Sequence, residues 1–135
     1  MPFFEWTDDL SVGIAEFDAH HRRMVELINN LHDVSAAQNT RVTVGNTLLS
    51  LSNYVIYHFL AEEDVMHRYQ YPDFEAHRQE HIRLTEKTLG FVAAFHRGPE
   101  DITSELLVFL VSWLRNHIMT VDKKYQEFLN SKGMH

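Results

Sequence analysis

The sequence predicts an all-α fold, an up-down-up-down antiparallel four-helix bundle with an extended N-terminal arm. Apolar residues recur in steps of three and four along four stretches of the chain, the pattern of helices packed on one another. Only three prolines and five glycines occur, so long regular helices are expected. The connections are short, which makes successive helices antiparallel neighbours.

The 135 residues suit one domain, 1–135, with one sizeable core. We expect the arm over residues 1–14 and helices over about 15–38, 43–70, 73–96 and 102–130. The arm shows no helical period, and its apolar Phe3, Phe4 and Trp6 should pack against the bundle because burial stabilises them.

The first two helices carry polar residues within their apolar seams. Gln38-Asn39-Thr40 is a plausible end for the first helix, and Pro72 prevents continuation of the second. The first seam reads Phe17, His21, Met24, Ile28, Leu31 and Ser35, and the second reads Val44, Leu48, Leu51, Val55, His58, Glu62, Val65 and Tyr69.

The last two helices repeat this pattern. Asp73 is a good N-cap for the third helix, Gly98-Pro99 ends it, and Thr103 or Asp101 can cap the fourth. The third seam reads Phe74, His77, His81, Leu84, Thr88, Phe91 and Phe95, and the fourth reads Leu106, Leu110, Trp113 and His117, with Asp122 beyond.

Composition excludes several classes of function. A formal net charge of -7 argues against nucleic acid or an anionic membrane as the main partner. The absence of cysteine removes disulfides, thiolate catalysis, cysteine-type zinc fingers and cysteine-ligated iron–sulfur clusters. The N-terminus has neither a basic region nor a long apolar run, so we expect no signal peptide, no membrane insertion and a cytoplasmic location.

Seven metal-competent residues fall at one end of the predicted bundle. Side chains four apart on a helix share a face, which pairs His58 with Glu62 and His77 with His81. Five imidazoles and two carboxylates exceed the needs of one ion and suit two ions bridged by the carboxylates. Nitrogen and oxygen ligands suit iron, manganese, copper or zinc. The candidate ligands are His21, His58, Glu62, His77, His81, His117 and Asp122.

Simpler interpretations exist for single members of this set. A lone core histidine is usually hydrogen-bonded rather than metal-bound, and Asp122 could be an exposed carboxylate paired with Lys123 or Lys124. The co-location of all seven favours a metal site. The remaining acidic and histidine side chains near the motifs are expected at the surface: His32, His67, His96, His135, Glu63, Asp64 and Glu80.

These motifs together resemble the hemerythrin family, and in particular its single-domain bacterial members, over nearly the whole chain. The residues that carry the resemblance are Phe17-Asp18-Ala-His-His21, His58-x-x-x-Glu62, His77-x-x-x-His81 and Trp113-Leu-Arg-Asn-His117-x-x-x-x-Asp122.

The resemblance implies a centre of two iron ions with an oxo or hydroxo bridge that binds dioxygen reversibly. One iron would take His77, His81 and His117, and the other would take His21 and His58, leaving a position open for oxygen. Glu62 and Asp122 would bridge the two ions.

The chain departs from the family pattern at two places. His20 stands where the family usually has glutamine, and a register slip of one residue would make it the ligand in place of His21. Asp122 follows His117 by five residues, which is about 140° apart on an ideal helix. We therefore expect a bend or bulge in the last helix.

Two classes of function remain open. The first is an oxygen-binding protein, not an enzyme, used for carriage or storage, with sensing as a variant. The second is an oxidase, peroxidase or nitric-oxide-handling enzyme, and a structural zinc bundle is a weaker third. We expect a monomer that yields its oxygen to a separate protein. Helical spacing from His21 and His117 puts Met24, Trp113 and Leu114 around the oxygen pocket.

Overall fold

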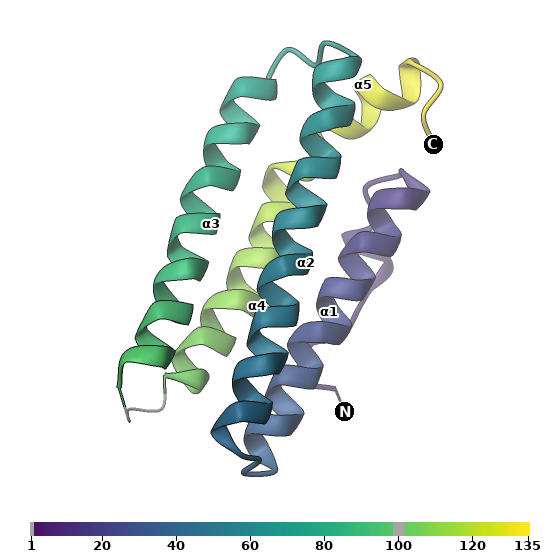
Figure 1. Ribbon diagram of the computed structural model, residues 1–135. Coiled ribbons are helices and arrows are strands. Elements are labelled where there is room, and N and C mark those ends of the chain that lie inside the picture. Colours follow the sequence, from purple (N-terminus) through teal and green to yellow (C-terminus); the bar gives the residue numbers. More distant parts are fainter. Residues whose placement is uncertain (1, 99–101) are drawn as a thin grey trace.

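Four long helices form the body of the protein, and the computed structural model describes residues 2–98 and 102–135. The helices are α1 (Ala15–Ala36), α2 (Arg41–Arg68), α3 (Phe74–Arg97) and α4 (Thr103–Thr120). They run alternately up and down, with α1 against α2 and α4, and with α2 against α3 (Figure 1). The described residues contain no strand, so the predicted all-α four-helix bundle is confirmed.

The connection between α2 and α3 is closed by backbone hydrogen bonds. Gln70, which follows the C-cap residue Tyr69 of α2, adopts a left-handed conformation with φ 58°. The N–H of Tyr71 then donates to the carbonyl of Met66 at 2.9 Å, the closure that commonly ends a helix. Pro72 follows this turn, and α3 starts two residues later. Helices α2 and α3 are thereby held as antiparallel neighbours.

The N-terminus of α2 carries a side-chain cap that can be tested. The Thr40 hydroxyl accepts a hydrogen bond from the N–H of Thr43 at 3.2 Å. Asp73 occupies the expected N-cap position of α3, but its side chain caps no N–H among the described residues. We expect Thr40→Ala to lower the free energy of unfolding by about 1 kcal/mol. Asp73→Ala should cost clearly less in the same urea titration, and equal losses would contradict this assignment.

The fourth helix is shorter than expected. Instead of continuing to about residue 130, α4 ends at Thr120 and is followed by a 3-10 turn, η2 (Asp122–Tyr125), and a short helix, α5 (Gln126–Ser131). The expected distortion near Asp122 is therefore present as a change of helix type. Thr103 is the first residue of α4 rather than its cap, since Ile102 holds the cap position, and Asp101 lies outside the described residues.

The N-terminal arm is anchored by specific polar contacts. It contains a 3-10 turn, η1 (Asp8–Leu10), and its other described residues, from 2 to 14, are not helical. The backbone of Phe4 exchanges two hydrogen bonds with the side chain of Asn29, at 2.7 and 2.8 Å. Phe4 is fully buried and Trp6 partly buried, as expected, whereas Phe3 remains 40% exposed and stacks on His32.

The core follows the predicted seams of α1, α2 and α4, whereas Phe74, Leu84 and Phe91 in the seam of α3 are only partly buried. The apolar seam residues of α1 and α2 are buried, except for the partly buried Tyr69 at the end of α2. In the second half of α3, Phe91 stacks on Phe109 of α4, with ring centroids 5.4 Å apart. None of the described helices is long and apolar enough to span a bilayer. The seven candidate ligands lie toward the opposite end, on the side of the α2–α3 connection.

Candidate metal centre

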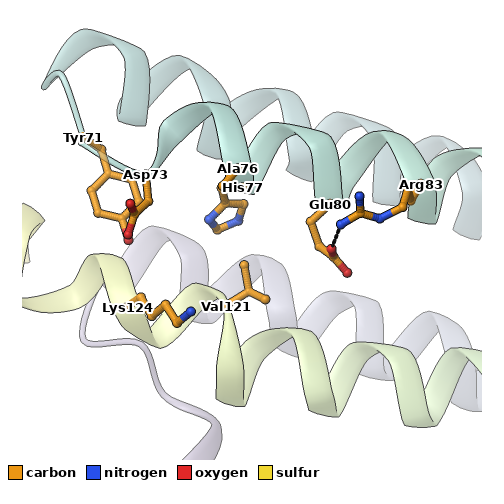
Figure 2. A pocket seen from close by; sticks show the side chains of 8 residues that line it. All are labelled: Tyr71, Asp73, Ala76, His77, Glu80, Arg83, Val121 and Lys124. Carbon is orange, nitrogen blue, oxygen red and sulfur yellow. Dashed lines mark hydrogen bonds and ion pairs between the residues drawn. The ribbon is translucent and has the colours of Figure 1, made fainter.

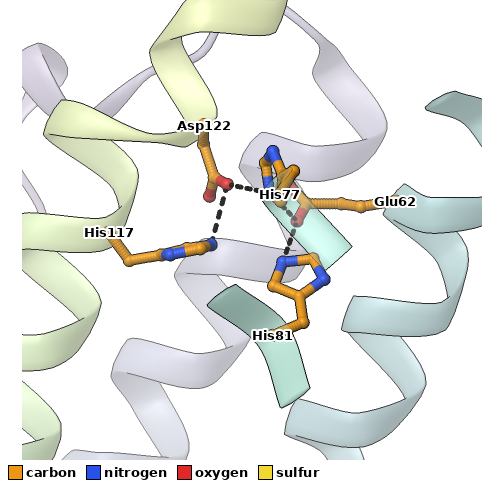
Figure 3. A group of neighbouring side chains, drawn as sticks. All are labelled: Glu62, His77, His81, His117 and Asp122. Atoms are coloured by element: carbon orange, nitrogen blue, oxygen red, sulfur yellow. Dashed lines mark ion pairs between the residues drawn. The ribbon is translucent and has the colours of Figure 1, made fainter. Parts of the chain in front are cut away.

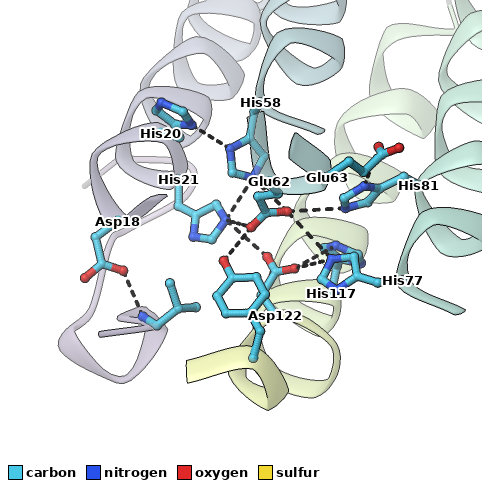
Figure 4. Close-up of polar contacts among 12 residues, drawn as sticks. Asp18, His20, His21, His58, Glu62, Glu63, His77, His81, His117 and Asp122 are labelled. Atoms are coloured by element: carbon cyan, nitrogen blue, oxygen red, sulfur yellow. Dashed lines mark hydrogen bonds and ion pairs between the residues drawn. The ribbon is translucent and has the colours of Figure 1, made fainter. Parts of the chain in front are cut away.

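All seven candidate ligands converge at one end of the bundle. His21 lies in the second turn of α1, His58 and Glu62 lie in the second half of α2, and the remaining four follow from α3, α4 and η2. The seven side chains point toward one another (Figure 4). Each is at most 4% exposed. Five imidazoles and two carboxylates in this little space, screened from water, are costly without partners that neutralise them. The seven side chains that meet are His21, His58, Glu62, His77, His81, His117 and Asp122.

Three histidines face one side of the two carboxylates, and we call this the three-histidine half. His77 Nε2 and His117 Nε2 each lie 3.0 Å from Asp122 Oδ1. His81 Nε2 lies 3.3 Å from Glu62 Oε1. One ligand atom from each of these five residues lies within 4.8 Å of every other, which is compact enough to hold one ion (Figure 3).

The two-histidine half consists of His21 and His58 with the same two carboxylates. His21 Nε2 lies 3.1 Å from Asp122 Oδ2, and His58 Nε2 lies 3.4 Å from Glu62 Oε1. The oxygens of Asp122 are thus divided, with Oδ1 toward the three-histidine half and Oδ2 toward His21. Both carboxylates belong to both groups, so the arrangement suits two neighbouring ions that share them.

Most of the unpartnered atoms of the cluster are those that a metal ion would use, the exceptions being Nδ1 of His21 and His117. All five histidines present Nε2 to the shared carboxylates. Among the described residues, several buried atoms lack a hydrogen bond despite these short contacts: Glu62 Oε1, both Asp122 oxygens, and Nε2 of His77, His81 and His117. Buried polar atoms are rarely left in this state. An all-nitrogen-and-oxygen donor set of this kind fits a pair of first-row transition metal ions.

The carboxylates of the cluster are strongly acidic. Burial alone would raise the pKa of Glu62, but the facing imidazoles of His58 and His21 outweigh it, and the pKa lies well below its ordinary value. Burial and the neighbouring Glu62 would likewise raise the pKa of Asp122, yet contacts with His117 and His21 hold it well below. Both bridging candidates are therefore ionised and ready to bind cations at neutral pH.

The pKa values of the cluster histidines are shifted in opposite directions by burial and by the neighbouring carboxylates. Burial lowers the pKa of His21 and His77, but contacts with Asp122 and Glu62 reverse this and raise the two values to about 9 and about 10. For His58 burial wins, and its pKa falls to about 4. Without metal, protons on His21 and His77 take the place of the cations. Metal binding must expel them and should strengthen as the pH rises.

These shifts predict how the stability of the metal-free protein depends on pH. Between pH 6.5, the ordinary histidine value, and about 9, folded His21 and His77 keep protons that the unfolded chain has lost. The free energy of unfolding should therefore fall as the pH rises through this window. Each group contributes at most about 1.4 kcal/mol per pH unit. Urea unfolding of chelator-treated protein at pH 6.5, 7.5 and 8.5 measures the slope.

A matched pair of variants tests whether the buried histidines of the cluster cause this dependence of stability on pH. His77→Gln should reduce it, whereas His67→Gln, which changes an exposed histidine, should leave it unchanged. A metal-free protein whose stability is flat or increases over the same window would contradict the account.

Two residues that contact the cluster were missed in the sequence. The buried Tyr125 hydroxyl donates to Glu62 Oε2 at 2.5 Å, which fixes the carboxylate from the side of η2. Its spacing of three from Asp122 was a usable signal. Glu63, expected in solvent, is only 18% exposed, and its Oε2 lies 3.0 Å from His81 Nδ1. No local pattern indicates this contact, because it depends on how α3 packs beside α2.

The structure also distinguishes the two adjacent histidines of α1. His21 points its Nε2 into the cluster, whereas His20 belongs to neither group of candidate ligands. Instead, His20 Nδ1 lies 2.9 Å from His58 Nδ1 (Figure 4). Asp122, for its part, is fully buried, which excludes an exposed pair with a neighbouring lysine.

The three residues expected around an oxygen pocket are all buried. Met24 and Leu114 are at most 1% exposed, and Trp113 is 6% exposed. The Trp113 ring stacks near His117, with centroids 6.0 Å apart, and meets Phe59 edge-on at 5.7 Å. Trp113 therefore covers the three-histidine half.

Solvent approaches the cluster from another side. A pocket of about 370 Å³ opens between α3 and η2 and reaches the buried His77 (Figure 2). Its other lining residues are Tyr71, Asp73, Ala76, Glu80, Arg83, Val121 and Lys124.

The remaining polar residues lie as expected, apart from Glu63. His67, His96 and His135 are exposed, and His32 is 36% exposed beside Asp33. Asp64 is exposed and pairs with Arg68, and Glu80 pairs with Arg83. They take no part in the cluster.

Comparisons with known proteins agree with this geometry. A family model described as the hemerythrin HHE cation binding domain matches residues 12–129. The chain is 35% identical to a bacteriohemerythrin of Stenotrophomonas maltophilia, over 94% of this chain and 82% of that one. A bacteriohemerythrin of Methylococcus capsulatus is 33% identical over 97% of this chain and its own full length, 100%.

A solved structure of wild-type hemerythrin superposes with a TM-score of 0.86 at 33% identity, covering 93% of this chain and 96% of that chain. The chain is therefore similar to these proteins both in sequence and in fold.

Proposed function

The chain belongs to the hemerythrin family, and from that premise we propose that it binds dioxygen reversibly at a non-haem di-iron centre, for carriage or storage. The observation that carries the proposal is the buried cluster of five Nε2 atoms around two shared carboxylates, several of whose atoms lack a partner among the described residues. Membership of the family favours iron over the other metals that such a donor set could hold.

Each half of the cluster would hold one iron ion. His77, His81 and His117 would hold the first, His21 and His58 would hold the second, and the two carboxylates would be shared, together with an oxo or hydroxo group. Two ferrous ions supply the electrons that reversible dioxygen binding requires. The unequal number of histidines leaves the second ion with fewer protein ligands, which is where we place oxygen.

The chain's own residues prepare this site in three ways. The Tyr125 hydroxyl holds Glu62 in place, and Glu63 accepts from His81 and so orients its ring. Apolar side chains keep water away: we propose that Met24 and Leu114 form the wall over the oxygen position, with Trp113 closing the side beside His117. This exclusion of water matters because water and protons would let the oxygen leave as peroxide, and the iron would then remain oxidised.

An enzyme on the same scaffold is the second candidate. The imidazole-rich ligand set argues against it, since neutral imidazoles supply less negative charge than carboxylates and stabilise highly oxidised iron less well. We further propose that the protein works as a monomer and that a separate protein accepts its oxygen.

The optical spectrum separates these possibilities. Reduced, iron-loaded protein should develop a visible absorption band in air that disappears under vacuum and returns with the same amplitude. Consumption of oxygen with release of peroxide would instead support an oxidase. A protein that stays colourless and contains zinc would overturn both.

A further inference from the structure

His20 stands directly behind one of the candidate ligands. Its Nδ1 lies 2.9 Å from Nδ1 of His58, and the two rings meet edge-on with centroids 5.1 Å apart (Figure 4). Both side chains are buried, at 8% and 1% exposure. The opposite nitrogen of His58, Nε2, faces Glu62 and His21 inside the cluster. One ring nitrogen thus points to the cluster and the other to His20.

The chemistry of imidazole then fixes where the proton lies. A neutral imidazole carries one N–H and one lone pair, and a metal ligand must present the lone pair to the ion. If Nε2 of His58 binds metal, its proton must lie on Nδ1, facing His20. Nδ1 of His20 must then be the acceptor, and the proton of His20 must lie on its own Nε2. A single hydrogen bond thereby selects the tautomers of both rings.

We propose that His20 is a positioning residue, which accepts the Nδ1 proton of His58 and so holds that ring with Nε2 directed at the metal of the two-histidine half. This inference rests on the proposed metal centre. His20 and His21, adjacent in α1, would then serve the same half in different ways. One supplies a ligand, and the other orients a ligand on α2.

The surroundings of His20 hold it in this role. Its ring packs against Phe17 of its own helix, at 5.8 Å between centroids, and against Tyr54 and Tyr57 of α2, at 6.1 and 5.4 Å. These contacts restrict the ring from two helices, so that the hydrogen bond to His58 does not depend on a freely rotating side chain.

Glu63 plays the matching part behind His81, where a carboxylate accepts the Nδ1 proton at 3.0 Å. The two halves therefore differ in what stands behind a ligand, since one partner is a neutral ring and the other an anion. Partners of this kind orient ligand rings, and their loss typically weakens metal binding about 10- to 100-fold.

The two partners provide matched variants for a test with cobalt(II). His20→Leu removes the acceptor and keeps an apolar side chain, whereas His20→Gln restores an acceptor oxygen. Metal-free protein would be titrated with cobalt(II), followed by visible absorption, and circular dichroism would establish that each variant folds. The parent should bind two equivalents.

His20→Leu should weaken one equivalent about 10- to 100-fold and leave the other unchanged. His20→Gln should bind nearly as the parent does. Glu63→Leu should weaken the equivalent that His20→Leu spares. In zinc-loaded parent protein, nitrogen-15 NMR should show the His58 proton on Nδ1.

Several results would overturn the inference. Binding of both equivalents by His20→Leu with parental affinity would do so. An equal loss of affinity in His20→Gln and His20→Leu would do so as well, because the effect would then be one of packing. Equal weakening of both equivalents in His20→Leu would mean a general structural defect. A folded parent that binds no cobalt would remove the metal centre itself, and with it this inference.

Discussion

Replacing Glu62 with alanine is expected to abolish metal binding in both halves of the site. The two carboxylate oxygens of Glu62 lie within 3.7 Å of Nε2 atoms of four histidines: His21, His58, His77 and His81. Glu62 also belongs to both groups of candidate ligands. Apart from a change at Asp122, no other single substitution would remove a member of both groups. The variant should therefore contain almost no iron after expression with ample iron.

The loss should also appear in thermal stability. An ion bound only by the folded chain at a concentration a thousand times its dissociation constant adds about 4 kcal/mol of stability. For a chain of this size that amounts to roughly 14 °C in melting temperature for each ion. The parent should thus melt higher with iron than without it, and Glu62→Ala should melt at one temperature in both conditions.

Two further variants complete this test. Asp64→Ala, on the same helix, removes an exposed carboxylate that pairs with Arg68, and it should keep the full iron content and the full metal-dependent shift. His117→Ala removes a ligand from the three-histidine half alone and should lose about one ion. If Glu62→Ala retained two irons per chain, the shared role of Glu62 would be wrong.

Replacing Leu114 with asparagine is expected to accelerate the decay of the oxygen-loaded protein to its oxidised, ferric form. Leu114 is fully buried in α4, one turn before His117. An amide at this position would bring a proton donor and make room for water beside the proposed oxygen position. A new hydrogen bond is worth about 1 kcal/mol or more, so the decay should become roughly tenfold faster.

The measurement is the disappearance of the oxygen-loaded spectrum at one pH and temperature, in variant and parent. Leu114→Met keeps the volume and the apolar character and should decay at close to the parental rate. Both variants must first be shown to hold two irons. If Leu114→Asn then decays no faster than the parent, Leu114 does not guard the pocket.

The repeating parts of this protein could be predicted from sequence. A histidine or glutamate that replaces an apolar residue at a seam position, such as His58 or Glu62, is directed into the core whatever the details of packing. Chain connectivity then determines which end of an antiparallel bundle it reaches. For that reason the bundle and the convergence of the seven side chains follow from spacing alone.

The parts that depend on contacts between helices could not be predicted. Glu63 neighbours Glu62 and was expected in solvent, yet it reaches His81 because α3 lies close beside α2 at that level. His20 could be recognised only as a possible competitor of His21, since nothing in the spacing shows a contact with His58 on another helix. Their roles become visible only when the helices are in place.

The C-terminal part of the chain contains one feature that spacing predicts and others that depend on packing. The spacing of five between His117 and Asp122 requires a departure from a regular helix, and the structure provides it as the 3-10 turn η2. Where α4 stops and how α5 continues depend on packing beyond the spacing rule. Tyr125 in η2 is buried, and its hydroxyl reaches Glu62. The distortion therefore brings both Asp122 and a partner for Glu62 into the cluster.

The metal content of the purified protein tests the central claim most directly. Protein expressed with ample iron and freed of loosely bound metal should contain two iron atoms per chain by elemental analysis, with little zinc, manganese or copper. Two ions follow from two compact groups of ligand atoms that share Glu62 and Asp122. One iron per chain, or mostly zinc under the same conditions, would contradict a di-iron centre.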